Sequence, residues 1–103
     1  MKILLDHCVP APVRRLLVSH EVRTAHEMIW QTLRNGELIA AAERSGFDLL
    51  ITADQNWQYQ QNLSGRLLAI LVLPTNNWVA LQSMSAEIAN AVSTIAVGAY
   101  REL

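Results

Sequence analysis

Short apolar runs alternate along the chain with longer stretches in which apolar residues recur at helical spacing. The longest run, Leu67–Leu73, contains no polar residue and stops at Pro74. Such runs are typical of strands that helices cover on both faces of a parallel sheet. The pattern therefore predicts an α/β domain with four or five mostly parallel strands, flanked by helices. Strands are expected at Lys2–Leu5, His20–Thr24, Phe47–Thr52 and Leu67–Leu73, with an edge strand in the tail Ala96–Arg101.

Helix signals fill the segments between these strands. Pro10 and Pro12 suit the first turn of a helix after the first strand, because proline lacks the N–H that is unpaired there. Asn35 is a good N-cap for a second helix, and Gly46 stands where a left-handed residue would end it. A final amphipathic helix is expected from Trp78 to about Val92.

Composition limits the class of protein. The chain has 103 residues, of which 51% are hydrophobic and 17% charged, with a formal net charge of −1 and one cysteine. These values suit one domain over residues 1–103 and argue against disorder and against a strongly basic nucleic-acid scavenger. A single cysteine excludes an internal disulfide, and no apolar run is long enough to cross a membrane. A cytoplasmic protein is the expectation.

Two of the three aspartates directly follow predicted strands. Asp6 ends the first strand and Asp54 follows Phe47–Thr52. Ligands of open parallel sheets bind beyond the carboxyl ends of the strands, so these two carboxylates are expected at one edge. Asp48 precedes the strand that Asp54 follows, roughly 20 Å away at about 3.3 Å per residue, and is therefore excluded from the same site.

Glu37 is expected to join them. A helix that connects parallel strands must begin at the carboxyl edge, and Glu37 lies in the first turn of the helix predicted to start at Asn35. Glu43 is about 9 Å further along the helix axis and falls on the wrong side. The topology thus selects Asp6, Glu37 and Asp54 as the candidate site.

Three facing carboxylates repel one another unless a cation joins them, and a hard ion such as Mg²⁺ or Mn²⁺ prefers oxygen ligands. A metal held this way activates water for phosphoryl displacement. Thr52 shares a strand face with Asp54 and is a candidate supporting hydroxyl. The alternative is purely structural: N-cap or turn roles for Asp6 and Asp54, and a helix-dipole role for Glu37.

The chain also resembles a known family. The opening Lys2–Leu5 strand with Asp6 and a proline-initiated helix, His20–Thr24, and the segment Asp48-Leu-Leu-Ile-Thr-Ala-Asp54 resemble PIN-like domains. The likeness is to short bacterial PIN-like proteins thought to act as toxin nucleases of toxin–antitoxin pairs, and it covers roughly residues 1–75. It implies a metal-dependent ribonuclease whose acids map onto Asp6, Glu37 and Asp54, with a cognate antitoxin as partner.

Two positions depart from the family pattern. His7 stands where an acid usually follows the first aspartate, and Asn35 stands where an aspartate is common. Asn35 still offers a neutral oxygen to a metal shell, but each lost carboxylate weakens cation affinity. Alternation along an extended segment predicts that His7 faces away from Asp6. The alternative function is therefore a binding or interaction module that has lost catalysis.

Other side chains suggest contacts with RNA or with a second copy. Arg34, at the predicted edge, is the best candidate to hold a phosphate, because a guanidinium bonds phosphate in a bidentate manner. Trp57 and Tyr59 follow Asp54 and would either stack on bases or pack structurally. The apolar face of Trp78–Val92 is a candidate homodimer surface.

Overall fold

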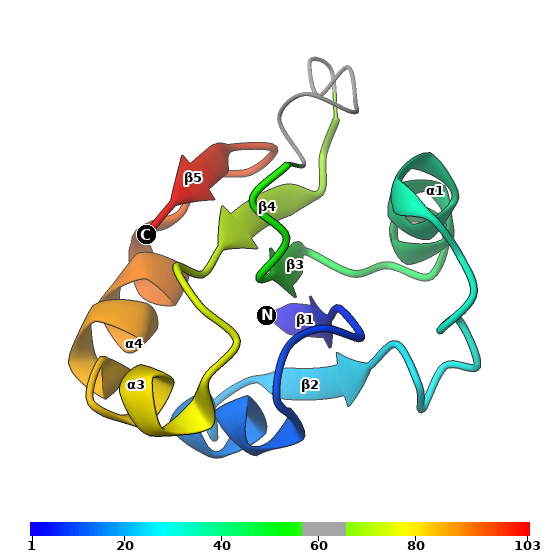
Figure 1. Cartoon of the computed structure of the whole chain (residues 1–103). Coiled ribbons are helices and arrows are strands. Elements are labelled where there is room, and N and C mark those ends of the chain that lie inside the picture. The colour runs from blue at the N-terminus through cyan, green and yellow to red at the C-terminus, as the bar shows by residue number, and fades with distance from the viewer. Residues whose placement is uncertain (57–65) are drawn as a thin grey trace.

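The protein is built on a five-stranded sheet in which every neighbouring pair of strands is parallel (Figure 1). The computed structural model describes residues 1–56 and 66–103. The strand order is β2-β1-β3-β4-β5, so β3 is central and β5 adds the expected edge strand. The strands are β1 (Lys2–Leu5), β2 (Glu21–Thr24), β3 (Leu49–Thr52), β4 (Ala69–Val72) and β5 (Tyr100–Glu102). The predicted α/β class is confirmed.

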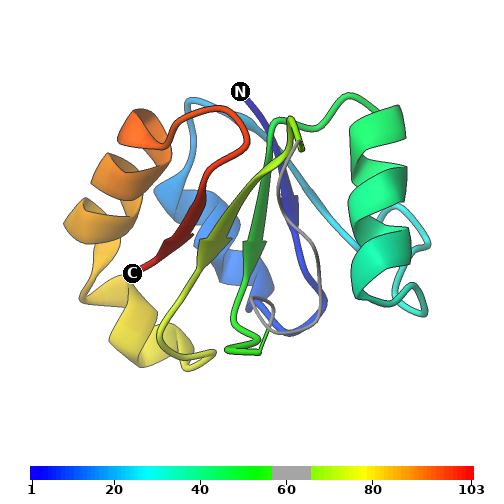
Figure 2. The same cartoon turned by 90° about the horizontal axis from the view of Figure 1, so that it is seen from above.

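Helices cover both faces of the sheet, which gives three layers (Figure 2). The helical elements are η1 (Ala11–Leu16, a 3-10 helix), α1 (Asn35–Arg44), α3 (Trp78–Gln82) and α4 (Ser85–Thr94). η1, α3 and α4 lie on one face, and α1 lies on the other (Figure 1). The continuous apolar runs in the sequence follow from this arrangement, because strands covered on both faces have no solvent-facing side.

Alternate residues of each strand enter two separate cores. Leu4, Leu50 and Ile70 pack toward α1, where they meet Leu38 and Ile39. Their neighbours in the strands point the other way, toward η1, α3 and α4, and this second group comprises Ile3, Leu5, Leu49, Ile51, Ala69 and Leu71. Because both sets are buried, β3 and β4 have no solvent-facing side and read as continuous apolar runs.

α1 begins at the carboxyl edge of the sheet and runs back antiparallel to the strands (Figure 2). Its N-cap is Arg34, so the expectation that Asn35 caps the helix is wrong by one residue. Gly46 follows the helix with φ +80°, the left-handed conformation predicted for it. The boundary shift at the start of α1 matters for the site, because it changes which way each side chain of the first turn points.

The single helix predicted from Trp78 to Val92 is two helices, α3 and α4. The hydroxyl of Ser83 donates to the carbonyl of Ala80 at 2.7 Å, and the backbone N–H of Met84 donates to the carbonyl of Leu81 at 2.9 Å. These local bonds tighten and end the last turn of α3. Leu81 and Ile88 remain fully buried, so the apolar stripe continues across the break.

Gly98 connects α4 to β5 in a confined place. Its φ is +72°, and a Cβ at this position would lie 2.2 Å from the carbonyl oxygen of Arg66. Only a residue without a side chain allows the two backbones to approach this closely. Within residues 1–56 and 66–103, no helix has the length and apolar character needed to cross a membrane.

Candidate functional site

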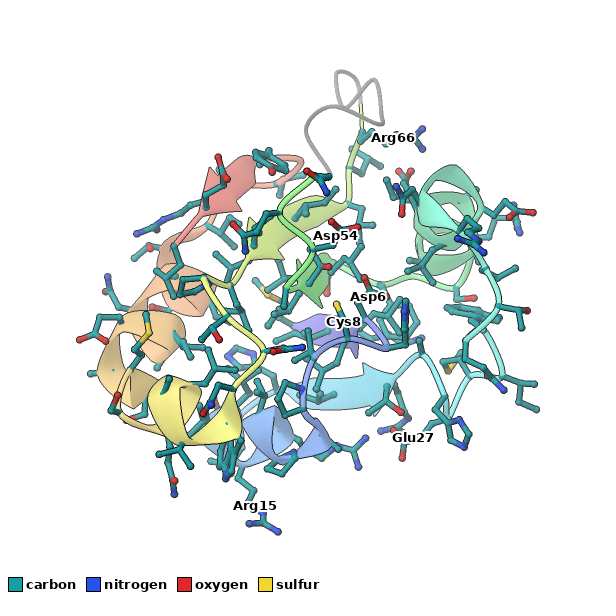
Figure 3. The ribbon with its side chains drawn as sticks, in the orientation of Figure 1. Asp6, Cys8, Arg15, Glu27, Asp54 and Arg66 are labelled. Carbon is teal, nitrogen blue, oxygen red and sulfur yellow. The ribbon has the colours of Figure 1, made fainter. Side chains whose placement is uncertain are left out.

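A pocket of about 470 Å³ lies at the carboxyl edge of the sheet, where β1 and β3 end. Figure 3 shows Asp6, Cys8 and Asp54 close together at this edge. The lining residues come from the loops after β1, β3 and β4 and from the start of α1, and they are Asp6, His7, Cys8, Leu33, Arg34, Asn35, Leu38, Ala53, Asp54 and Asn76. The strand ends thus bring Asp6 and Asp54 to one pocket.

Asp6 is a buried acid whose hydrogen bonds are supplied by its own loop and by β3. Its side chain has 5% exposure, yet the backbone N–H of His7 donates to Oδ1 at 2.8 Å and the hydroxyl of Thr52 donates to Oδ2 at 2.8 Å. A carboxylate has about four lone-pair sites, and the ring nitrogen of His7 at 3.0 Å from Oδ1 and the thiol of Cys8 at 3.8 Å from Oδ2 lie against the other two. The carboxylate is therefore held in one orientation.

Thr52 joins the two acids. Its hydroxyl donates to Asp6 and accepts a hydrogen bond from the backbone N–H of Asp54 at 3.1 Å. Thr52 is fully buried, so both bonds are shielded from water. The supporting hydroxyl predicted at this position thus links the end of β1 to the loop after β3.

Cys8 lies between the same two strand ends. Its Sγ is 3.8 Å from Oδ2 of Asp6 and 3.6 Å from Oγ1 of Thr52, and it accepts a hydrogen bond from the backbone N–H of Ala53 at 3.4 Å. Burial raises the pKa of the Cys8 thiol, and the negative charge of Asp6 adds to this effect. Cys8 is therefore a neutral packing residue near neutral pH.

Asp54 is half-buried and forms a turn with its own loop. Its Oδ1 accepts a hydrogen bond from the backbone N–H of Asn56 at 2.9 Å. This is the turn-forming role that was the structural alternative for Asp54. The bond occupies one side of the carboxylate, and the residue still lines the pocket.

The first turn of α1 contributes Arg34 and Asn35 to the pocket, whereas Glu37 is exposed and is not among the lining residues. Oε1 of Glu37 accepts a hydrogen bond from the backbone N–H of Arg34 at 3.3 Å. With Arg34 as N-cap, Glu37 is at N3, where glutamate closes back on the N-cap. Its role as a metal ligand stays a prediction, and its observed role is to cap the helix.

His7 does not face away from Asp6, and that prediction is wrong. Nδ1 of His7 is 3.0 Å from Oδ1 of Asp6, while 62% of the imidazole side chain is exposed. The strand has already ended at Leu5, so residues 6–8 form a turn and side chains no longer alternate between faces. In this turn the side chains of His7 and Cys8 both approach the Asp6 carboxylate.

The acids excluded by topology lie at the other edge of the sheet. Oδ2 of Asp48 accepts a hydrogen bond from the backbone N–H of Lys2 at 2.7 Å, next to the start of β1. The guanidinium of Arg66 pairs with Oε1 of Glu43 at 3.1 Å. Both acids border a different, largely apolar pocket.

The described residues do not form an all-protein metal cage. Within residues 1–56 and 66–103, no three His, Cys, Asp or Glu side chains are grouped closely enough to hold a metal ion. Mg²⁺, however, keeps several waters and is commonly held by one or two carboxylates together with substrate phosphates. Asp6, Asp54 and Asn35 line the same pocket and are the side chains that could hold such an ion.

Three polar or thiol side chains that line the pocket were not predicted to belong to the site: His7, Cys8 and Asn76. Asn76 follows β4, and the rule that located Asp6 and Asp54 would have found it, since the carboxyl end of every strand opens on the same edge. Cys8 gave no signal, because its placement depends on the turn after β1. Trp57 and Tyr59 lie outside the described residues.

The fold and site define an all-parallel α/β protein with an acidic pocket at the carboxyl edge of its sheet. No protein-family model matches the chain, and no curated protein or solved structure is detectably similar to it. The function is therefore argued from the pocket itself.

Thr52→Val is expected to lower the free energy of unfolding by about 1–3 kcal/mol, because it leaves the buried Asp6 carboxylate and the Asp54 N–H without the hydroxyl. Urea unfolding of the single variants and of the double variant with Asp6→Asn measures the coupling. The Thr52→Val cost should shrink in the Asp6→Asn background; equal costs in both backgrounds would show that the hydroxyl does not support the carboxylate.

Proposed function

We propose that the chain is a metal-dependent ribonuclease of the PIN-like toxin type, with a cognate antitoxin protein as its partner. The observation that carries the proposal is the meeting of two carboxylates, Asp6 and Asp54, from adjacent parallel strands in one pocket. In open α/β sheets, ligands bind beyond the carboxyl ends of the strands, and Asp6 and Asp54 follow two such ends.

Asp6 and Asp54 would hold Mg²⁺ or Mn²⁺, with the amide oxygen of Asn35 as a neutral neighbour. When bound there, such an ion supplies a more acidic water and stabilises charge on a phosphodiester. Glu37 would act as a third ligand only if its side chain turned toward the pocket, which it does not line in this structure. The bonds from Thr52 and His7 keep the Asp6 carboxylate oriented without the ion.

The position of Arg34 favours a phosphodiester as the substrate. Its side chain is exposed and borders both the acidic pocket and an adjoining hollow that includes His7 and Gln31. A planar guanidinium forms two parallel hydrogen bonds with phosphate, which would fix the scissile group over the two acids. Phosphate contacts of this kind give affinity without base specificity.

A second candidate is a binding module on the same fold that does not cleave. It is favoured by the hydrogen bonds that each acid already makes: Asp6 with Thr52, Asp54 with Asn56, and Glu37 with Arg34. These bonds stabilise the loops whether or not an ion binds. Metal affinity separates the two candidates.

Calorimetric titration with Mn²⁺ tests the proposal. Micromolar binding is expected for the native chain, a loss of more than about tenfold for Asp6→Asn and for Asp54→Asn, and a smaller loss for Glu37→Gln, whose amide retains the helix cap. Asp48→Asn is the matched control, because it removes one acid at the opposite edge. No binding at millimolar Mn²⁺ would reject the nuclease in favour of the module.

A further inference from the structure

A separate hollow of about 410 Å³ lies between η1 and the edge strand β2, and we call it the arginine hollow. It shares no lining residue with the acidic pocket. Three of the chain's seven arginines border it, together with one histidine and one acid: Arg14, Arg15, Arg23, His20 and Glu21. In a chain with a net charge of −1, this is a concentration of positive charge.

The arginines of this hollow differ in how far their charge is neutralised. Arg14 is paired with Glu27. Arg23 approaches Glu21 only to 3.9 Å, and both side chains are about half exposed. Arg15 forms no hydrogen bond or ion pair with any described residue, and its side chain extends into solvent (Figure 3). Arg15 and Arg23 are therefore available to an anion.

The hollow runs along β2 from Glu21, which is in register with Lys2 at the edge opposite the acidic pocket, and its Arg14 extends toward the carboxyl edge. Glu27, the partner of Arg14, also accepts a hydrogen bond from the backbone N–H of Thr24, the last residue of β2. Thr24 is in register with Leu5, which directly precedes Asp6. Adjacent strands are about 4.8 Å apart, so the Arg14–Glu27 pair lies near the strand next to the β1 end of the pocket.

We propose that this arginine hollow binds backbone phosphates of a single RNA strand whose scissile phosphate lies in the acidic pocket. The choice of RNA as the polyanion rests on the proposed function. Arg15 and Arg23 present planar guanidinium groups, which suit phosphate oxygens, and no described Phe, Tyr or Trp lines the hollow to stack on bases. The contacts are therefore electrostatic and independent of base sequence, and Glu21 opposes them.

The test is the salt dependence of RNA binding in EDTA, where metal-dependent cleavage does not enter. Fluorescence anisotropy with a labelled oligouridylate of about 12 nucleotides, between about 50 and 200 mM KCl, gives the slope of log K against log salt. Arg15→Gln with Arg23→Gln should reduce the slope by about 1.4, at about 0.7 per lost phosphate contact. Glu21→Gln should instead strengthen binding.

Matched controls remove the same charges elsewhere: Arg44→Gln on the exposed end of α1 and Glu102→Gln on β5 should leave the slope unchanged. An unchanged slope in the double arginine variant would overturn the proposal. So would displacement of the RNA by an oligoglutamate of equal charge at equal concentration, which would indicate an acidic protein partner. If RNA binding depends on the hollow but the chain never cleaves RNA, the proposed nuclease function is rejected and the proposed RNA-binding role of the hollow stands.

Discussion

Asp54→Asn is expected to lower the rate of metal-dependent RNA cleavage by more than about 100-fold. Changes to the outer partners of metal ligands already cost about 10- to 100-fold, and this change removes the charge of a proposed ligand itself. The asparagine side-chain oxygen still accepts the hydrogen bond from Asn56, so the turn after β3 is preserved. The measurement is the initial rate of cleavage of a labelled RNA with Mn²⁺ present and after chelation.

Asp48→Asn serves as the control, since it removes one carboxylate at the opposite edge and should cleave at the native rate. Asp6→Asn should also lose activity, but it exchanges an acceptor for a donor facing Thr52, so its loss mixes metal binding with stability. Native-rate cleavage by Asp54→Asn, or cleavage that persists in chelator, would contradict the proposed mechanism.

Gly98→Ala is expected to lower the free energy of unfolding by more than about 3 kcal/mol. The left-handed backbone costs about 1–2 kcal/mol for an L-residue, and the new Cβ would meet the backbone of Arg66 at 2.2 Å. A backbone carbonyl has no rotamer that relieves such a contact, so the connection to β5 must shift. Urea unfolding followed by circular dichroism measures the loss.

Gly46→Ala isolates the conformational part of this cost. Gly46 has a similar φ of +80°, but a Cβ there meets no atom within 4 Å. The expected loss is only about 1–2 kcal/mol. Equal losses for the two variants would mean that the close approach of Gly98 to Arg66 does not constrain the fold.

The strands could be predicted well from the sequence because a strand that is buried on both faces of the sheet is a continuous apolar run. Leu50 and Ile51 point to opposite cores, yet both are fully buried, so the strand has no polar alternation to interpret. The carboxyl-edge rule then placed Asp6 and Asp54 in one pocket, because it depends only on strand order and direction.

Side-chain directions outside the strands were predicted less well, because they depend on single-residue boundaries. Moving the N-cap from Asn35 to Arg34 turns each side chain by about 100° relative to the cap and places Glu37 at the capping-box position. His7 was assigned by strand alternation, although the strand ends before it. Composition and period do not encode such boundaries.

The all-parallel arrangement also shapes how the protein reaches its native state. Among the described strands every neighbouring pair is parallel, so no hairpin joins them, and Leu5 of β1 must pair with Ile51 of β3 to form the centre of the sheet. Pairings this distant along the chain close large loops before any contact repays the lost entropy. We therefore expect refolding to be slow for a chain of this length, with the side of β1 that pairs with β3 exposed until β3 folds, even if β2 has already paired with β1.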